Sequence, residues 1–235
     1  MIYLYTGTPG SGKSYHVAKE IYFYLYHGRN VIANFDINYD SIPSRKRRPK
    51  GYFFYRENHE LSADWLMDFA LFCHKRRPDG HIIEGQTWVV IDECQLIFNC
   101  RSWNAKDRDK WNNFFTQHRK YGYHFILVTQ FDRLVDRQIR SLVEYEVRHR
   151  KANNFGIGGV LCSLFFFGHP IFAAIEYWYS VKERCGTSIM IGRKKYYCLY
   201  DSYKLFDGEE KKPNILPPAG MGGTGGPRPR RGQDV

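Results

Sequence analysis

The sequence predicts an α/β fold in which helices flank a parallel sheet, and three stretches support this prediction. At residues 2–25, a short apolar strand leads into a glycine-rich loop and then into apolar residues at helical spacing. Residues 88–91 are all apolar and are followed by two carboxylates. Residues 123–130 form a further apolar run that ends in two polar residues. Continuous apolar runs of this kind are typical of strands buried on both faces of a parallel sheet.

The glycine-rich loop matches the G-x-x-x-x-G-K-[ST] phosphate-binding pattern (P-loop) in full. Glycines let the main chain turn its N–H groups toward an anion, and the helix N-terminus adds further donors. We expect Lys13 to reach the β- and γ-phosphates of ATP and Ser14 to bind Mg²⁺. The alternative is a glycine-rich turn that matches by chance, but the strand before it and the helix after it favour a nucleotide site. The predicted ATP-binding residues are Gly7, Thr8, Pro9, Gly10, Ser11, Gly12, Lys13, Ser14 and Tyr15.

Asp92 and Glu93 are predicted to form the second half of this site. They follow a buried strand, and the carboxyl ends of parallel strands are where α/β proteins bind ligands. Downstream of a P-loop, the first carboxylate, Asp92, is expected to hold the Mg²⁺ shell. The second, Glu93, is expected to polarise the water that attacks the γ-phosphate. A lone Asp-Glu pair would carry little information, but the loop upstream favours the catalytic interpretation.

Gln130 is the predicted sensor of the γ-phosphate. We expect the strand that it ends to lie between the P-loop strand and the carboxylate strand. That position would bring a polar side chain to the terminal phosphate. The alternative is a strand that simply ends in polar residues.

Two longer helices are predicted between these strands. One covers residues 61–77 with Ser62 as its cap, and the other covers residues 104–119 with Asn104 as its cap. In both, apolar side chains recur at helical spacing.

A short helical turn is predicted at residues 135–142, with a strand after it at residues 145–147. Arg140 in this turn is our candidate for an arginine finger, a side chain that acts on ATP bound by a neighbouring subunit. Surface salt bridges are the alternative role. The other candidates for the same role are Arg119, Arg133 and Arg137.

The chain is basic, with a formal net charge of +11. This balance favours anionic partners such as nucleic acid or a membrane surface. The cations are densest in the loop at residues 41–51, which contains Arg45, Lys46, Arg47 and Arg48. We expect this loop to contact the phosphate backbone of single-stranded DNA. A solvated loop is the alternative.

Residues 152–175 contain no Lys, Arg, Asp or Glu and are long enough to raise the question of a membrane span. Glycines and the pair His169-Pro170 interrupt the stretch, which favours a buried or interfacial hairpin-like insertion over a span. We therefore expect any membrane association through Ala152 to Ile175 to be interfacial, without a segment that crosses the bilayer.

The remaining sequence predicts a β-rich extension followed by a tail. Residues 175–206 alternate like paired strands, with turns at Cys185-Gly186 or Ile191-Gly192. The predicted division is an ATPase core at 1–150, the apolar insertion and β-rich extension at 151–206, and a disordered Pro/Gly/Arg tail at 207–235.

The N-terminus and the cysteines predict a cytoplasmic protein. Met1 leads straight into the first strand, without the basic and apolar regions of a signal peptide. The six cysteines show no C-x-x-C pair and no zinc-ligand spacing, so we expect buried free thiols in a reducing compartment.

These pieces together resemble the N-terminal ATPase domain of the zonular occludens toxin-like family, which includes the assembly proteins of filamentous bacteriophages. The stretches that carry the resemblance reach nearly to Phe206. They are IYLYTGTPGSGKS, NVIANFDI, WVVIDECQ, HRKYGYHFILVTQ, DRQIRSLVEYEVR and CLYDSYKLF. The resemblance implies a P-loop ATPase of the ASCE class (RecA-like, close to the FtsK/HerA branch) that acts in phage morphogenesis.

The function expected from residues and resemblance is a Mg²⁺-dependent ATPase. It would drive assembly and extrusion of filamentous-phage DNA at the inner membrane of the host bacterium. Its expected partners are further copies of itself in a ring, single-stranded phage DNA, and phage coat or export proteins. Two alternatives stay open. One is a nucleotide-gated docking scaffold with little turnover, and the other is a kinase for a small acceptor.

Overall fold

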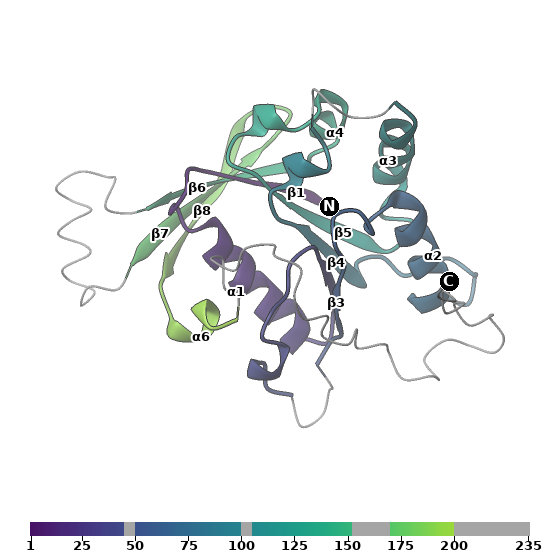
Figure 1. Cartoon of the computed structure of the whole chain (residues 1–235), viewed down its shortest axis with the longest axis horizontal. Coiled ribbons are helices and arrows are strands. Elements are labelled where there is room, and N and C mark those ends of the chain that lie inside the picture. The colour runs from purple at the N-terminus through teal and green to yellow at the C-terminus, as the bar shows by residue number, and fades with distance from the viewer. Residues whose placement is uncertain (45–49, 100–104, 152–169, 200–235) are drawn as a thin grey trace, which may run out of the picture.

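The structure is a computed structural model, and it describes residues 1–44, 50–99, 105–151 and 170–199. In these ranges eight strands form one sheet with the order β3-β2-β4-β5-β1-β6-β7-β8 (Figure 1). The strands are β1 Ile2–Thr6, β2 Asn30–Ala33, β3 Phe53–Tyr55, β4 Thr87–Ile91, β5 Tyr123–Val128, β6 Tyr145–Lys151, β7 Ile171–Trp178 and β8 Glu183–Ile191. The helices are α1 Lys13–Tyr26, α2 Ala63–Cys73, α3 Ala105–Gln117, α4 Arg137–Ser141 and α6 Lys194–Tyr197, with short 3₁₀ turns η1 Tyr39–Ser41, η2 Cys94–Leu96 and η3 Asp132–Leu134.

The strands from β1 to β6 run parallel, and their order is the one that the functional argument requires. β5 pairs with β1 on one side and with β4 on the other, so the strand that leads to Gln130 lies between the P-loop strand and the carboxylate strand. The prediction of an α/β parallel sheet with this strand in the middle is therefore confirmed.

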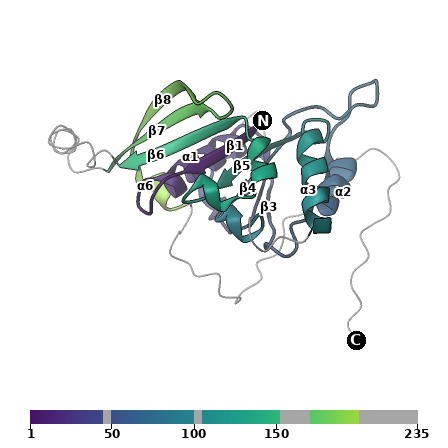
Figure 2. The ribbon, with the colours of Figure 1, turned by 90° about the horizontal axis from the view of Figure 1, so that it is seen from above.

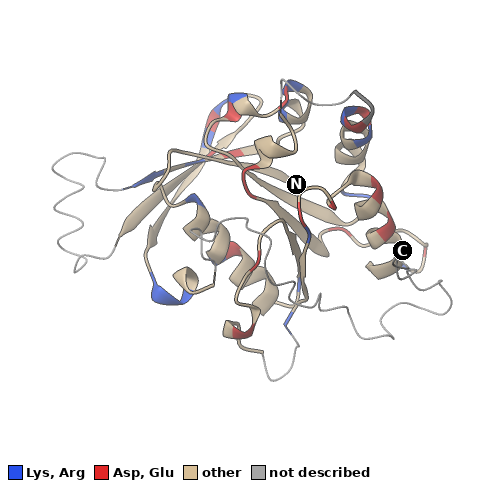
Figure 3. Ribbon diagram, viewed as in Figure 1, with Lys and Arg blue, Asp and Glu red and all other residues tan. Residues whose placement is uncertain are grey.

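Helices cover both faces of the sheet, and each face has its own apolar core (Figure 2). Alternate residues of a strand point to opposite faces, so Leu4 packs among α2, α3 and α4, whereas Tyr5 packs under α1. On the outer layers, α3 carries charged residues of both signs and α6 carries lysines (Figure 3). The result is a three-layer α/β/α architecture.

Local signals account for several helix boundaries. The hydroxyl of Ser62 accepts a hydrogen bond from the N–H of Trp65 at 3.1 Å, which caps α2 as predicted. The carboxylate of Asp136 caps α4 in the same way, through the N–H of Gln138 at 2.9 Å. α1 ends at Tyr26, and the positive φ of Gly28 (79°) turns the chain toward β2.

The predicted helix at 61–77 was too long. α2 stops at Cys73 because His74 leaves the helix in an extended conformation. Its imidazole bonds to the carbonyl oxygen of Tyr121 at 2.6 Å and to the hydroxyl of Thr87 at 2.7 Å. These long-range partners outweigh the local helical pattern. The short strand β3 was not predicted either.

β7 and β8 extend the sheet as an antiparallel hairpin, which agrees with the predicted β-rich extension. The predicted turn at Cys185-Gly186 was wrong, because both residues lie inside β8. The chain turns instead at residues 179–182, where Lys182 has a positive φ of 58°, and the ladder shifts register at Glu176/Tyr177. Ile191-Gly192 does end β8.

The cysteine prediction holds only in part for the described residues. Cys94 is buried and Cys73 is half-buried, but Cys185 and Cys198 are exposed. Cys185 is exposed because β8 is the edge strand of the sheet, and Cys198 because it ends the short surface helix α6.

Five predicted segments fall wholly or partly outside the described residues. These are the basic residues 45–48, the cap Asn104, residues 152–169 of the apolar stretch, residues 200–206 of the β-rich extension, and the tail at 207–235. The end of the apolar stretch is described, and Ile171 to Ile175 lie in β7 as part of the sheet. Among the described helices, none combines the length and the hydropathy needed to cross a bilayer.

Candidate nucleotide site

The P-loop lies between the end of β1 and the start of α1, where the predicted strand and helix meet. Gly7, Gly10 and Gly12 all have positive φ angles, of 143°, 74° and 97°. This backbone conformation is open to glycine and costly for other residues. Thr8 to Gly10 are exposed, whereas Ser11 is buried. The hydroxyl of Ser11 has no hydrogen-bond partner among the described residues, as fits a loop that a bound anion completes.

Neighbouring strands press closely on this loop. A Cβ atom at Gly12 would lie 2.5 Å from the ring of Phe172 on β7. A Cβ atom at Gly7 would lie 2.7 Å from the carbonyl oxygen of His149 on β6. The loop therefore needs glycine at both positions for space as well as for backbone conformation.

Lys13 begins α1, and its ammonium group turns back into the loop. It donates to the carbonyl oxygen of Gly7 at 2.7 Å and to that of Thr8 at 3.3 Å. Burial lowers the pKa of Lys13, and attraction to Asp92 and Glu93 opposes that shift. The lysine and both predicted carboxylates thus lie close enough to interact, although about eighty positions separate them in the sequence.

Asp92 and Glu93 follow β4 in a sharp turn. Asp92 Oδ1 accepts the N–H of Glu93 at 2.9 Å. Glu93 itself has left-handed φ and ψ angles of 45° and 47°, which are uncommon for a residue with a side chain. Its carboxylate accepts a hydrogen bond of 2.5 Å from the amide of Gln95. Each of the two carboxyl groups is thus held by a hydrogen bond within the turn.

Asn34 is a member of this site that the sequence analysis did not select. It follows β2, and its side chain is 1% exposed. Asn34 Oδ1 accepts the N–H of Asp92 at 2.7 Å, and Asn34 Nδ2 donates to the carbonyl oxygen of Asp92 at 2.8 Å. One sequence signal could have identified Asn34: it is a polar residue directly after a buried strand, as Asp92 is after β4.

Gln130 lies beside the loop, as its strand position predicts. Its carbonyl oxygen accepts the N–H of Gly7 at 3.2 Å, and the neighbouring Thr129 N–H bonds to the carbonyl oxygen of Tyr5. The main chain after β5 is thereby fastened to the first residue of the P-loop. The role of the Gln130 side chain as a sensor stays a prediction.

The oxygen donors suit Mg²⁺ better than a transition metal. Ser14 offers a hydroxyl in the half-buried first turn of α1, and Asp92 offers a carboxylate. No cluster of three or more His, Cys, Asp or Glu side chains with metal-binding geometry occurs among the described residues. Mg²⁺ in nucleotide sites takes one or two protein oxygens and completes its shell with phosphate oxygens and water. Ser14 and Asp92 fit that pattern.

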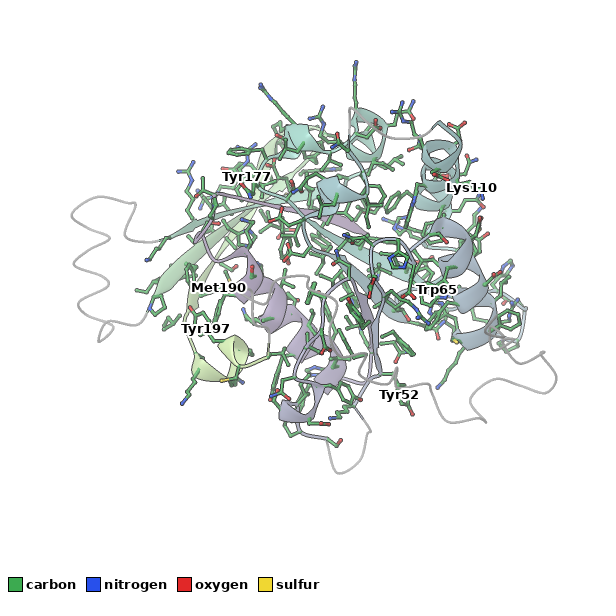
Figure 4. All side chains as sticks on the ribbon, in the orientation of Figure 1. Tyr52, Trp65, Lys110, Tyr177, Met190 and Tyr197 are labelled. Atoms are coloured by element: carbon green, nitrogen blue, oxygen red, sulfur yellow. The ribbon has the colours of Figure 1, made fainter. Side chains whose placement is uncertain are left out.

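Tyr15, a predicted ATP-binding residue, has a side chain that bonds away from the P-loop. The hydroxyl of Tyr15 donates to the carbonyl oxygen of Ile191 at 2.7 Å and accepts the N–H of Arg193 at 3.0 Å, so its side chain fastens α1 to β8. Figure 4 shows Tyr197 and Met190 on this same side of α1. The main chain of Tyr15 remains the part available to a phosphate.

Arg140 lies on α4, on the segment that carries the chain from the carboxyl end of β5 back toward the start of β1. Four residues later, Glu144 bonds through its N–H to the carbonyl oxygen of Ile2. Within the described part of the chain, no hydrogen bond or ion pair joins Arg140 to a residue of the nucleotide site. Its predicted role was to act on a neighbouring subunit, and that role stays untested.

A buried histidine pair lies behind the loop. His16 Nδ1 and His149 Nε2 are 2.8 Å apart, and His149 Nδ1 donates to the carbonyl oxygen of Thr6 at 3.1 Å. Burial lowers the pKa of His149 to about 3. The two residues are 133 positions apart in the sequence, which is why sequence patterns could not pair them.

Comparison with known proteins gives one family. The profile of the family described as "Zonular occludens toxin (Zot)" matches residues 1–204. The Gene 1 protein of Enterobacteria phage fd is 30% identical over 166 residues, which cover 69% of this chain and 46% of that protein. The Gene 1 protein of Enterobacteria phage I2-2 is 25% identical over 225 residues, 92% of this chain and 60% of the relative. The matched regions thus span less than two thirds of these relatives.

Solved structures support the fold. The N-terminal domain of zonular occludens toxin from Neisseria meningitidis is 21% identical, with a TM-score of 0.50 over 85% of this chain and 98% of that one. A second solved structure, an ATPase domain, is 11% identical, with a TM-score of 0.51 over 84% of this chain and 83% of that one. The fold is that of P-loop NTPases, and by its sequence match over residues 1–204 the chain belongs to the Zot family.

Proposed function

We propose that this chain binds and hydrolyses ATP with Mg²⁺ and so drives the assembly and export of a filamentous phage from its bacterial host. The observation that carries the proposal is that Lys13, Asp92 and Glu93 lie close enough to interact, beyond the carboxyl ends of β1 and β4. The relatives named as Gene 1 proteins of filamentous phages support the biological setting.

Each residue has a distinct part in the proposed reaction. The N–H groups of the P-loop and the Lys13 ammonium bind the phosphates, while Ser14 and Asp92 would hold Mg²⁺, which supplies positive charge beside the γ-phosphate. Glu93 orients the attacking water, and Gln130 contacts the terminal phosphate. Catalysis by such a site depends on positioning and on electrostatic stabilisation, because phosphoryl transfer to water needs no covalent intermediate with the protein.

The proposed partners are further copies of the chain, DNA and the membrane. Arg140 of one subunit would act on ATP held by its neighbour, as an arginine finger does. Residues 45–48 would bind single-stranded DNA through its phosphates. Residues 152–169, the part of the apolar stretch that precedes β7, would contact the inner membrane from its cytoplasmic side, where coat and export proteins would meet the complex.

The test is the release of inorganic phosphate from ATP by the purified chain, with and without single-stranded DNA. We expect turnover that requires Mg²⁺ and rises with DNA. Glu93→Gln should abolish turnover and leave nucleotide binding intact, whereas Lys13→Ala should weaken binding itself. ATP binding without phosphate release in any condition would overturn the proposal in favour of a nucleotide-gated scaffold. A phosphorylated small acceptor among the products would indicate a kinase.

A further inference from the structure

Asn34 lies where the ladder between β2 and β4 ends. Main-chain pairing of these strands runs from Asn30↔Thr87 to Ala33↔Val90. One residue further on, the side-chain amide of Asn34 bonds to both main-chain polar groups of Asp92. An amide side chain carries the same N–H donor and C=O acceptor as a peptide unit. It therefore continues the ladder by one residue after the two backbones separate.

The chemistry leaves one orientation for this amide. The N–H of Asp92 can only donate, so it must face Asn34 Oδ1, and the carbonyl oxygen of Asp92 can only accept, so it must face Asn34 Nδ2. The second proton of Asn34 Nδ2 goes to Asn58 Oδ1 at 2.8 Å. Asn58 lies in the connection between β3 and α2, and its hydrogen bond helps to fix the orientation of the Asn34 amide. All three bonds involve a side chain that is 1% exposed, where each unpaired polar group costs free energy.

We propose that Asn34 is a positioning residue for the nucleotide site, whose clamp on the main chain of Asp92 aims the Asp92 carboxylate at Mg²⁺. Asp92 Oδ1 in turn accepts the N–H of Glu93 and so supports the left-handed turn there. One side chain thus sets the direction of both carboxylates. The proposal rests on the proposed function in assigning Asp92 to Mg²⁺, but it concerns a residue that touches neither metal nor nucleotide.

The test measures how much Mg²⁺ tightens the binding of a fluorescent, non-hydrolysable ATP analogue. Asn34→Asp keeps the acceptor but loses both donors, so its carboxylate oxygen would face the carbonyl oxygens of Asp92 and Asn58. We expect the Mg²⁺-dependent gain in affinity to fall by about tenfold or more, as is usual when a group that orients a metal ligand is removed. Affinity without Mg²⁺ should match wild type, because the P-loop is unchanged.

Asn30→Asp is the matched control, because it makes the same chemical change at the other end of the same strand. Asn30 Oδ1 accepts the N–H of Tyr52 at 3.0 Å, a bond that aspartate can also accept. This variant should keep the full Mg²⁺ response. A wild-type Mg²⁺ response in Asn34→Asp would overturn the proposal, and so would an equal loss in both variants.

A second measurement is independent of nucleotide and covers the case in which Asn34→Asp does not fold. In Asn58→Ala, the clamp loses its support but keeps both bonds to Asp92. We expect faster hydrogen exchange at the Asp92 amide and a smaller loss of the Mg²⁺ response. Unchanged exchange and response in this variant would refute the clamp. A different result is that Mg²⁺ does not tighten nucleotide binding in wild type, while Asn58→Ala still speeds hydrogen exchange at the Asp92 amide. The hydrogen bonds of Asn34 to Asp92 would then be confirmed, and the assignment of Asp92 to Mg²⁺ would be wrong.

Discussion

The ammonium group of Lys13 donates a hydrogen bond to the carbonyl oxygen of Gly7 at 2.7 Å, within the same P-loop. A phosphate entering the loop offers this ammonium a charged acceptor in place of a neutral one, and hydrogen bonds between charged groups are the stronger kind. Asp92 and Glu93 lie close enough to interact electrostatically with this lysine. The arrangement keeps the lysine positioned before nucleotide arrives.

Lys13→Ala should weaken ATP binding by at least about tenfold while leaving the protein folded. The lost contact with phosphate is worth about 1.4 kcal/mol or more, and the freed carbonyl of Gly7 remains near solvent. Equilibrium binding and thermal unfolding measure the two effects. Lys110→Ala makes the same change on the outer side of α3, far from the loop (Figure 4), where Lys110 pairs with Asp64. It should bind ATP normally; equal weakening in both variants would contradict the role of Lys13.

Gly12→Ala should damage the loop more than Gly10→Ala does. Both glycines have positive φ, so either substitution costs about 1 kcal/mol in backbone strain. At Gly12 the new methyl group would also lie 2.5 Å from the ring of Phe172, whereas at Gly10 it would meet no atom within 4 Å. Chemical denaturation should show a loss of about 2 kcal/mol or more for Gly12→Ala. Equal stability losses would mean that β7 does not press on the loop.

Glu93→Gly should separate stability from activity. Glycine adopts the left-handed conformation at position 93 without the strain of about 1 kcal/mol that glutamate bears there. We expect a free energy of unfolding at least equal to that of wild type, together with loss of phosphate release, because the water-orienting carboxylate is gone. Denaturation curves and phosphate assays on the same preparation measure both. Wild-type turnover in this variant would exclude Glu93 from catalysis.

Stability should fall as the pH falls from about 6.5 to about 4. Burial lowers the pKa of His74 and that of His118 to about 4, whereas histidines in an unfolded chain titrate near 6.5. Between pH 4 and 6.5 the unfolded chain binds more protons than the folded chain, so acid favours unfolding. The stability that these neutral histidines contribute is fully present only above pH 6.5. Each buried histidine should contribute a slope of about 1.4 kcal/mol per pH unit.

His74→Gln tests this pH dependence, because glutamine can bond to Tyr121 and Thr87 without titrating. Denaturation at several pH values should show a shallower slope than wild type over the same window. An unchanged slope in His74→Gln would show that this imidazole is not held neutral by burial.

Local sequence was enough to predict the P-loop, the β4 strand with its two carboxylates, and the β5 strand with its polar end. In each case the determining pattern lies within about ten consecutive residues, and the parallel sheet then brings the strand ends to one edge. The resemblance to the Zot family followed from the order of such short stretches, and the family match agrees with it.

Tertiary structure alone decided how the site is held together. The bonds of Asn34 to Asp92 span 58 positions, the His16–His149 pair spans 133, and the bond of Tyr15 to Ile191 spans 176. Tertiary contacts likewise ended α2 at His74 and moved the β7–β8 turn away from Cys185-Gly186. Hydrophobic periodicity records which face of an element is buried, but it does not record which distant polar group will lie opposite. A buried polar side chain must find a partner wherever the fold supplies one, and that partner became known only once the strands were placed side by side.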